Sequence, residues 1–263
     1  KNEFHSTSIA DFISVRYKRS QGLAALISLL CFIGITPYLT IQLKSVIDSF
    51  QVLTTNSQLT LAFIDYLDIL IVLMMAFFTI MFGVRHIDPT ERHPGMMVAL
   101  AGESIIKLLA MLIGTLWVCY ILNPGVFSIF EEVANQAELN PKVLTISTQQ
   151  WLSFMLIGAL GIMTLPRQFH VGIVECSDPK FLDRAKWLFP LYLLLINIFT
   201  FPVALSALLS PETLASANLL LLTLPLTEHA PFIALITFLG GFAAATGMIM
   251  ISAMTLSTML TNH

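Results

Sequence analysis

The chain has 263 residues, of which 56% are hydrophobic and only 11% are charged. Soluble domains carry roughly 25% charged residues, so this composition, with a mean hydropathy of +0.83, excludes an ordinary soluble domain and predicts an integral membrane protein. The formal net charge of −3 is small. We expect the lipid bilayer to be a partner of the chain and expect no nucleic-acid partner.

The two ends and the cysteines give further expectations. The chain begins at Lys1 without a Met or a signal-peptide pattern and stops just after a hydrophobic segment. We therefore expect a fragment truncated at both ends, with residues 1–263 forming a single partial transmembrane domain. Cys31, Cys119 and Cys176 lack the paired spacing of a metal or redox site, so we expect three free thiols.

Six segments are apolar enough to cross a bilayer, which requires about 20 apolar residues in a helix. They lie near residues 24–43, 67–84, 96–122, 151–166, 187–209 and 232–259. The chain is therefore predicted to be an all-α integral membrane protein with six transmembrane helices, of which the fourth is the shortest.

The first and third of these segments contain polar side chains at helical spacing. Tyr38 and Gln42 follow Pro37 and lie four residues apart, so their polar groups point to one side of the first helix. Glu103 and Lys107 have the same spacing in the third helix and could form an intramembrane charge pair. Ionisable groups at this depth are costly unless they are paired or hydrated, so the pair serves either a structural role or a role in coupling or gating.

The fourth and sixth segments contain small residues. Gly158, Gly161 and Pro166 predict that the fourth helix is broken, and broken helices form the solute sites of many transporters. The sixth helix contains Gly240, Ala243, Ala244, Thr246 and Gly247. Close packing between helices explains the same residues equally well, and both interpretations stay open.

The loops predict the orientation and two further helices. Residues 128–139 and the apolar run between Pro211 and Pro225 are expected to form short outer helices. Most cations fall in the N-terminal segment and in the second and fourth loops, and most acids fall in the other loops, so both ends are expected to be cytoplasmic. The cations are Lys1, Arg16, Lys18, Arg19, Arg85, Arg92, Arg167, Lys180, Arg184 and Lys186. Three loop histidines lie beside these cations and are expected to be solvated or to contact lipid headgroups: His86, His93 and His170.

Three motifs resemble those of the sodium:solute symporter family. SIADFISVRYKRS (8–20) resembles the motif that precedes the family's fourth helix, the Tyr38 and Gln42 spacing resembles its Y-x-x-x-Q, and PRQFHVGIVE (166–175) resembles its segment after the seventh helix. The resemblance implies a partial five-plus-five inverted-repeat bundle of the leucine-transporter type. It also implies that Tyr38, Gln42, Gly158 and Gly161 contact the solute.

A narrower resemblance joins the chain to the symporter-like membrane half of bacterial sensor histidine kinases of the carbon and nitrogen balance regulator type. It rests on residues 82–110, RQFHVGIVE, residues 184–199, and the AATGMIM and STMLTNH segments of the sixth helix. It implies a bacterial inner-membrane protein whose chain continues into a cytoplasmic kinase region that acts on a response regulator. No catalytic residue or cofactor site is found within this chain.

The sodium site of the symporters is altered here. Sodium-coupled members place a small residue and then, three and four positions later, two hydroxyl side chains that bind the ion. The corresponding positions are Gly240, Ala243 and Ala244, and the register that starts at Ala243 supplies only the hydroxyl of Thr246. We expect a degenerate ion site without tight sodium coupling. The family's cytoplasmic T-D-x-x-Q is also altered, in residues 90–94.

Three functions are compatible with this sequence. The first is the input domain of a sensor kinase, which binds or transports a small organic solute such as an amino acid. The second is a freestanding solute symporter coupled to sodium or protons, with Glu103 and Lys107 as coupling groups. The third is an unrelated six-helix membrane protein.

Overall fold

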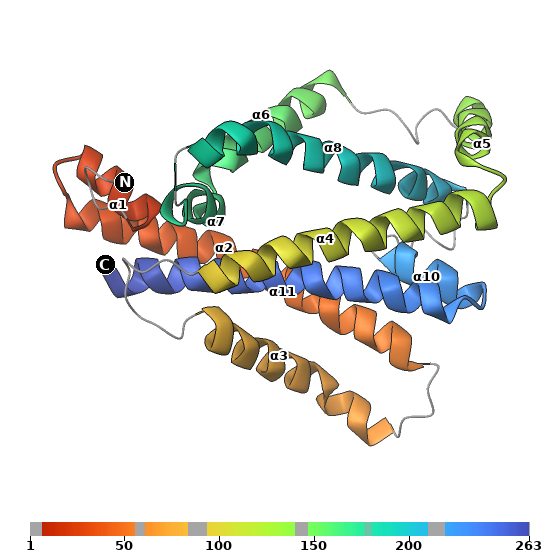
Figure 1. Ribbon diagram of the computed structural model, residues 1–263, viewed down its shortest axis with the longest axis horizontal. Helices are drawn as coiled ribbons and strands as arrows, with labels where there is room; N and C mark the ends of the chain where they lie inside the picture. The colour runs from red at the N-terminus through yellow and green to blue at the C-terminus, as the bar shows by residue number, and fades with distance from the viewer. Residues whose placement is uncertain are drawn as a thin grey trace.

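The computed structural model describes residues 7–55, 61–83, 94–139, 147–176, 178, 180–209 and 219–262. These residues are helical, and no strand occurs among them. In chain order (Figure 1) the elements are α1 (Ile9–Arg16), α2 (Gln21–Thr55), α3 (Leu61–Gly83), α4 (Pro94–Trp117), η1 (Val118–Leu122), α5 (Val126–Leu139), α6 (Thr148–Thr164), α7 (Pro166–Phe169), η3 (His170–Val174), α8 (Lys180–Leu208), α10 (Leu220–Thr227) and α11 (Pro231–Asn262). The predicted all-α class is confirmed.

Each of the six predicted apolar segments coincides with a helix, but fewer helices are long and apolar enough to cross a membrane. Four of the described helices are: Gln21–Thr54, Gly95–Leu122, Lys180–Leu208 and Pro231–Asn262. A fifth is formed by α6 together with α7 and η3 if this pair, bent by 42°, is one broken span. In α3 only the shorter stretch Asp68–Met81 is apolar among the described residues. The chain thus has four or five candidate spans, and the count of six stays a prediction.

Local sequence sets several helix boundaries. The Ser8 hydroxyl accepts from the backbone N–H of Asp11 at 3.1 Å and so caps α1. Ser147 and Gln150 form a capping box that starts α6. The two helices predicted in the third and fifth loops are present as α5 and α10.

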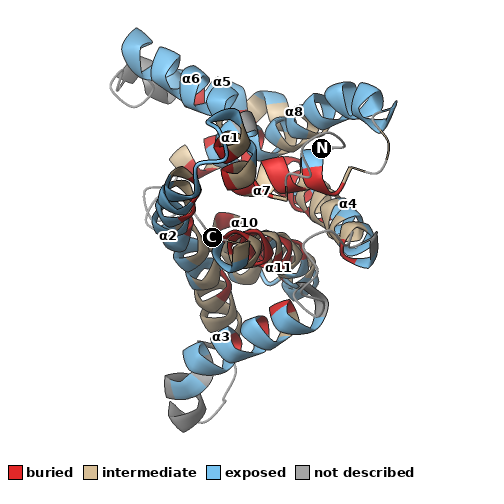
Figure 2. Cartoon of the chain, turned by 90° about the vertical axis from the view of Figure 1, so that its left-hand side faces the viewer, coloured by how far each residue is buried: buried red, intermediate tan, exposed pale blue. Residues whose placement is uncertain are grey.

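Helix α11 lies at the centre of the molecule and packs against α2, α3, α4 and α10 (Figures 1 and 2). Two of its glycines allow α4 to approach closely: a Cβ at Gly240 would collide with Ala110, and a Cβ at Gly247 would collide with Glu103. Gly240 meets Ala110, whereas Gly247, which lies later on α11, meets Glu103, which lies earlier on α4. The two helices therefore run antiparallel. Small residues at a helix interface permit this close contact.

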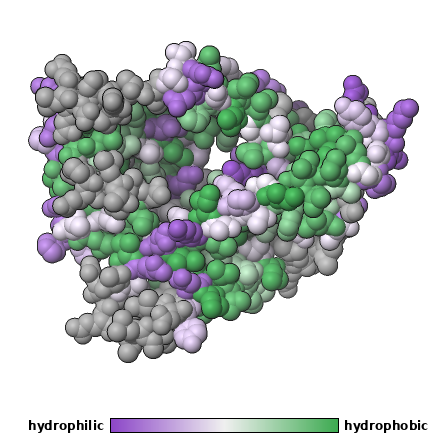
Figure 3. All heavy atoms as spheres, turned by 180° about the vertical axis from the view of Figure 1, so that it is seen from behind, coloured by the Kyte–Doolittle hydropathy of each residue, from purple (hydrophilic) through white to green (hydrophobic). Residues whose placement is uncertain are grey.

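Outside this centre, large apolar side chains are exposed. Phe77, Trp187 and Ile121 have exposed fractions of 65%, 75% and 73%. Extensive exposed apolar surface is unfavourable in water, and Figure 3 shows how much of one face is apolar. The outer surfaces of the helices therefore contact lipid.

The two ends of the described chain lie at the same end of the bundle, at the left of Figure 1. There the side-chain amide of Asn262 donates to the Thr7 hydroxyl at 2.9 Å. Followed along the colour bar, α2, α3, α4, α6, α8 and α11 alternate in direction (Figure 1). This arrangement is the one required if both ends lie on one side of a membrane; the inverted-repeat relation stays a prediction.

Candidate functional site

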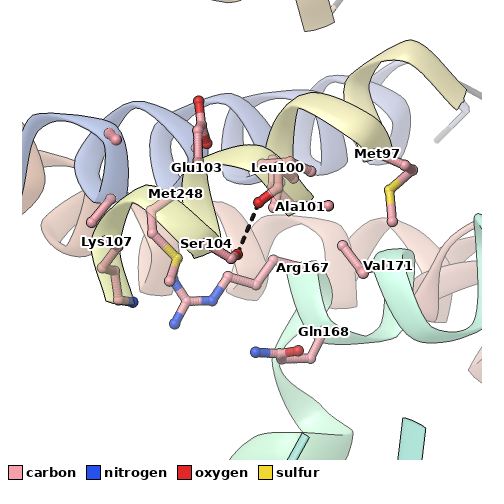
Figure 4. Close-up of a pocket in the computed structure, with 14 residues that line it drawn as sticks. Met97, Leu100, Ala101, Glu103, Ser104, Lys107, Arg167, Gln168, Val171 and Met248 are labelled. Atoms are coloured by element: carbon pink, nitrogen blue, oxygen red, sulfur yellow. Dashed lines mark hydrogen bonds between the residues drawn. The ribbon is translucent and has the colours of Figure 1, made fainter. Parts of the chain in front are cut away.

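A cavity of about 300 Å³ lies between α4, α7 and α11 (Figure 4). Its lining residues come from these three helices and from η3: Met97, Leu100, Ala101, Glu103, Ser104, Lys107, Arg167, Gln168, Val171, Ala243, Ala244, Gly247, Met248 and Ile251. Most are apolar, and three are charged.

The cavity lies within the candidate spans, and on α4 it extends from Met97, near the start of the helix, to Lys107, near its middle. Lys107 is about 18 Å along the helix axis from Gly95, at a rise of 1.5 Å per residue, and a hydrocarbon core is about 30 Å thick. Tyr38, Tyr192 and Thr246 also lie near the middle of the apolar helices that carry them. Four candidate spans therefore bring polar groups together at one depth.

Glu103 and Lys107 project from α4 but have different partners. The Thr246 hydroxyl on α11 lies 3.3 Å from Oε1 of Glu103 and 2.9 Å from the carbonyl oxygen of Ala243. Nζ of Lys107 lies 6.0 Å from the centroid of the Tyr192 ring on α8. The ion pairs within the described part of the chain do not include one between Glu103 and Lys107. In Figure 4 Glu103 points toward α11, away from Lys107.

Arg167 enters the cavity from α7. Its Cζ lies 4.2 Å from the centroid of the Tyr38 ring, and its Nη1 donates to Sδ of Met248 at 3.3 Å. Its Nε is buried and has no hydrogen-bond partner among the described residues. The sequence placed Arg167 among the cytoplasmic loop cations. The structure places Arg167 in α7, directly after the bend, with its side chain turned toward α2 and α11.

The bend itself is at Leu165, which has extended backbone angles (φ −69°, ψ 122°). Proline disfavours the helical conformation in the residue that precedes it, so Pro166 explains why α6 ends here. The predicted break is thus located at the proline. Gly158 and Gly161 lie within continuous α6 and are not among the residues that line the cavity. No residue of the segment 151–166 lines the cavity, which receives Arg167, Gln168 and Val171 from the helical turns after the break.

The predicted ion-site positions all lie on the part of α11 that faces α4. Ala243 and Ala244 line the cavity, Gly240 contacts Ala110, and Thr246 contacts Glu103. The residues present do not fit a sodium ion, because two of the expected oxygen ligands are methyl groups and the cavity carries two cationic side chains.

Two residues of α2 were predicted to contact the solute. One of them, Tyr38, is connected to the cavity because its ring packs against the Arg167 guanidinium group. Gln42 is half-buried one helical turn further along α2 and is not among the residues that line the cavity. The structure therefore brings Tyr38, Glu103, Lys107 and the α11 positions together, whereas Gln42, Gly158 and Gly161 do not line the cavity.

A second cavity of about 340 Å³ continues along the same helices. It is lined by residues of α2, α4, α8, α10 and α11, including Ser45, Ser49 and Gly240. Lys107 and Ala244 line both cavities. Lys107 therefore lies at the boundary between two hollow regions along the α4–α11 contact.

His170 was expected to have a solvated or headgroup role, and the structure contradicts solvation. Its side chain in η3 is only 4% exposed, and its Nε2 lies 3.4 Å from Oε1 of Glu175, which is 2% exposed. The π-helical turn folds this segment against the bundle, which removes both side chains from solvent. The altered T-D-x-x-Q motif, His86 and His93 lie outside the described residues.

The three cysteines are free, as predicted. Among the described residues, no group of three or more His, Cys, Asp or Glu side chains is arranged to hold a metal ion. Comparisons with protein-family models, with curated proteins and with solved structures found no match to this chain.

Proposed function

We propose that this chain is a solute-binding membrane domain that serves as the input of a bacterial sensor histidine kinase. The cavity supports solute binding, because it places three charged side chains between candidate spans, where lipid could not solvate them. Charged residues inside a membrane domain usually mark a substrate pathway. The kinase assignment rests on the resemblance of residues 82–110, 167–175 and 184–199, and of the AATGMIM and STMLTNH segments, to such proteins.

In this proposal the solute acts by shifting a conformational equilibrium. Only a difference between its affinities for two conformations can drive signalling. The cavity walls belong to α4, α7 and α11, and α7 is joined to α6 by the bend at Leu165. A solute that bridges Arg167 on α7 to Lys107 on α4 would favour the conformation with these helices close together, and a following kinase region would respond to it.

One observation favours a freestanding transporter as the second candidate. The two cavities share Lys107 and Ala244, so together they outline a path along the α4–α11 contact. In this candidate function, a solute that crosses the membrane passes Lys107 as it moves from one cavity to the other. Protons are the coupling ion that agrees with this site, since Glu103 and Lys107 are both ionisable.

The gene sequence after residue 263 and the activity of the full-length protein test the two candidates. A kinase region with a phosphorylatable histidine, whose autophosphorylation in lipid nanodiscs changes at least about twofold with a small organic solute, supports the sensor. The change should be lost in Lys107→Gln and kept in Lys186→Gln, which removes an exposed cation. A chain that lacks a kinase region and accumulates solute in proteoliposomes would contradict the sensor assignment and support the transporter.

A further inference from the structure

The charges of the side chains that line the cavity between α4, α7 and α11 do not balance. Lys107 and Arg167 contribute two positive charges, and Glu103 contributes one negative charge. The ion pairs within the described ranges are His170 with Glu175 and Lys186 with Asp183, so neither cavity cation has a carboxylate within 4.0 Å among these residues. The cavity therefore has an excess of positive charge at a depth where an uncompensated charge is costly.

Arg167 is held in place but not neutralised. The Tyr38 ring and the Met248 sulfur fix the position of its guanidinium group at 4.2 Å and 3.3 Å, and neither of them carries a negative charge. Its buried Nε has no hydrogen-bond partner in the described part of the chain. A guanidinium group presents parallel N–H donors that match the two oxygens of a carboxylate.

The size and the walls of the cavity restrict the ligand further. A volume of about 300 Å³ is at the lower end of the range for small-molecule sites. Apart from the polar groups, its walls are formed by apolar side chains such as Met97, Leu100, Val171 and Ile251. A ligand that fits is compact and combines one anionic group with an apolar body.

We propose that the solute of this domain is a compact organic carboxylate whose anionic group binds Arg167 and Lys107. Glu103 lines the same cavity and can accept an ammonium group, so amino acids with small apolar side chains belong to this class. The inference rests on the proposed solute-binding function and adds the chemical class of the ligand.

Matched ligands with and without a carboxylate test this proposal. The probes are acetate, propionate, isovalerate and leucine, each paired with its carboxamide, and chloride as an inorganic anion. Binding to the chain in lipid nanodiscs is measured by the shift in its thermal unfolding midpoint and by titration. We expect at least one carboxylate to bind at least about tenfold more tightly than its carboxamide, as the loss of a charge-assisted hydrogen bond predicts.

Substitutions locate the binding to this cavity. Arg167→Gln and Lys107→Gln should each weaken the carboxylate by about tenfold or more, and Arg167→Lys, which keeps the charge but not the parallel donors, should have an intermediate affinity. Lys186→Gln removes an exposed cation outside the cavity and should leave the affinity unchanged. If Arg167→Gln does not fold, Arg167→Lys still tests the role of the guanidinium group in binding.

The possible outcomes separate the two proposals. Carboxamides that bind as tightly as carboxylates, with sensitivity to the same substitutions, overturn the carboxylate assignment and leave solute binding intact. Displacement of the carboxylate by equimolar chloride shows an inorganic anion site and also overturns it. If none of the carboxylates binds, the proposed ligand class is wrong. The solute-binding function is tested separately, by the change in autophosphorylation of the full-length protein with a small organic solute.

Discussion

At the scale of single residues, the contact between Glu103 and Thr246 changes how the α4 charges are understood. Glu103 and Lys107 have the spacing of an ion pair, yet Glu103 faces the Thr246 hydroxyl of α11. One hydroxyl proton serves both Glu103 and the carbonyl oxygen of Ala243. An interhelical contact of this kind contributes about 0.6 kcal/mol on average inside membrane proteins. Thr246 thus connects the two central helices through a charged group.

We predict that Thr246→Val lowers the free energy of unfolding by about 1 kcal/mol more than Thr255→Val does. Thr255 is a buried residue of the same helix whose hydroxyl bonds only to the carbonyl oxygen of Ile251, so the control loses an intrahelical bond alone. Unfolding in mixed detergent micelles measures both values.

A double-mutant cycle with Glu103→Gln isolates the interhelical part of this effect. A coupling of about 0.5 kcal/mol or more between residues 103 and 246 is expected for groups in direct contact. A coupling of zero would contradict the contact.

At the scale of elements, the antiparallel pair of α4 and α11 forms the frame of the site. Gly240 is buried against Ala110, whereas its neighbour Gly241 is exposed, with open space where its Cβ would lie. The short side chain of Ala110 cannot move aside by rotation. Close approach here keeps the Glu103, Lys107 and Thr246 side chains within one cavity region.

Gly240→Ala is predicted to reduce stability by about 1–3 kcal/mol because it overpacks the contact with Ala110. Gly241→Ala should be neutral or stabilising by up to about 1 kcal/mol, because alanine favours the helix and meets no atom. Both variants are compared by unfolding in detergent micelles. Equal stability of the two variants would show that α4 and α11 are not in close contact at Gly240.

At the scale of the whole molecule, most of the described cations gather at one end of the bundle, whereas Lys44 and Lys107 lie within α2 and α4. Arg16, Lys18 and Arg19 lie where α1 joins α2, and the lysines at the start of α8 lie at the same end, at the left of Figure 1. Helix α5, which carries Glu131 and Glu132, lies at the opposite end. The bias of Lys and Arg toward one end orients a membrane protein with that end in the cytoplasm.

Cysteine labelling in intact cells tests this orientation, in a background whose three native cysteines are replaced by alanine. A membrane-impermeant maleimide should label Glu132→Cys in intact cells, and should label Arg19→Cys only after the membrane is permeabilised. Lys186→Cys, at the same end as Arg19, should behave like Arg19→Cys. Labelling of Arg19→Cys and Glu132→Cys from one side would contradict the predicted topology.

The sequence by itself determined the helical membrane class and the approximate positions of the six apolar helices and of α5 and α10. These features are local, because a bilayer requires apolar side chains and internally bonded backbone within each segment. Only the tertiary structure decided that Arg167 lines the cavity, that Glu103 faces Thr246 and that His170 is buried. Each depends on contacts between helices far apart in the chain. Lipid and protein neighbours are both apolar, so hydrophobicity along one helix does not reveal which face meets another helix.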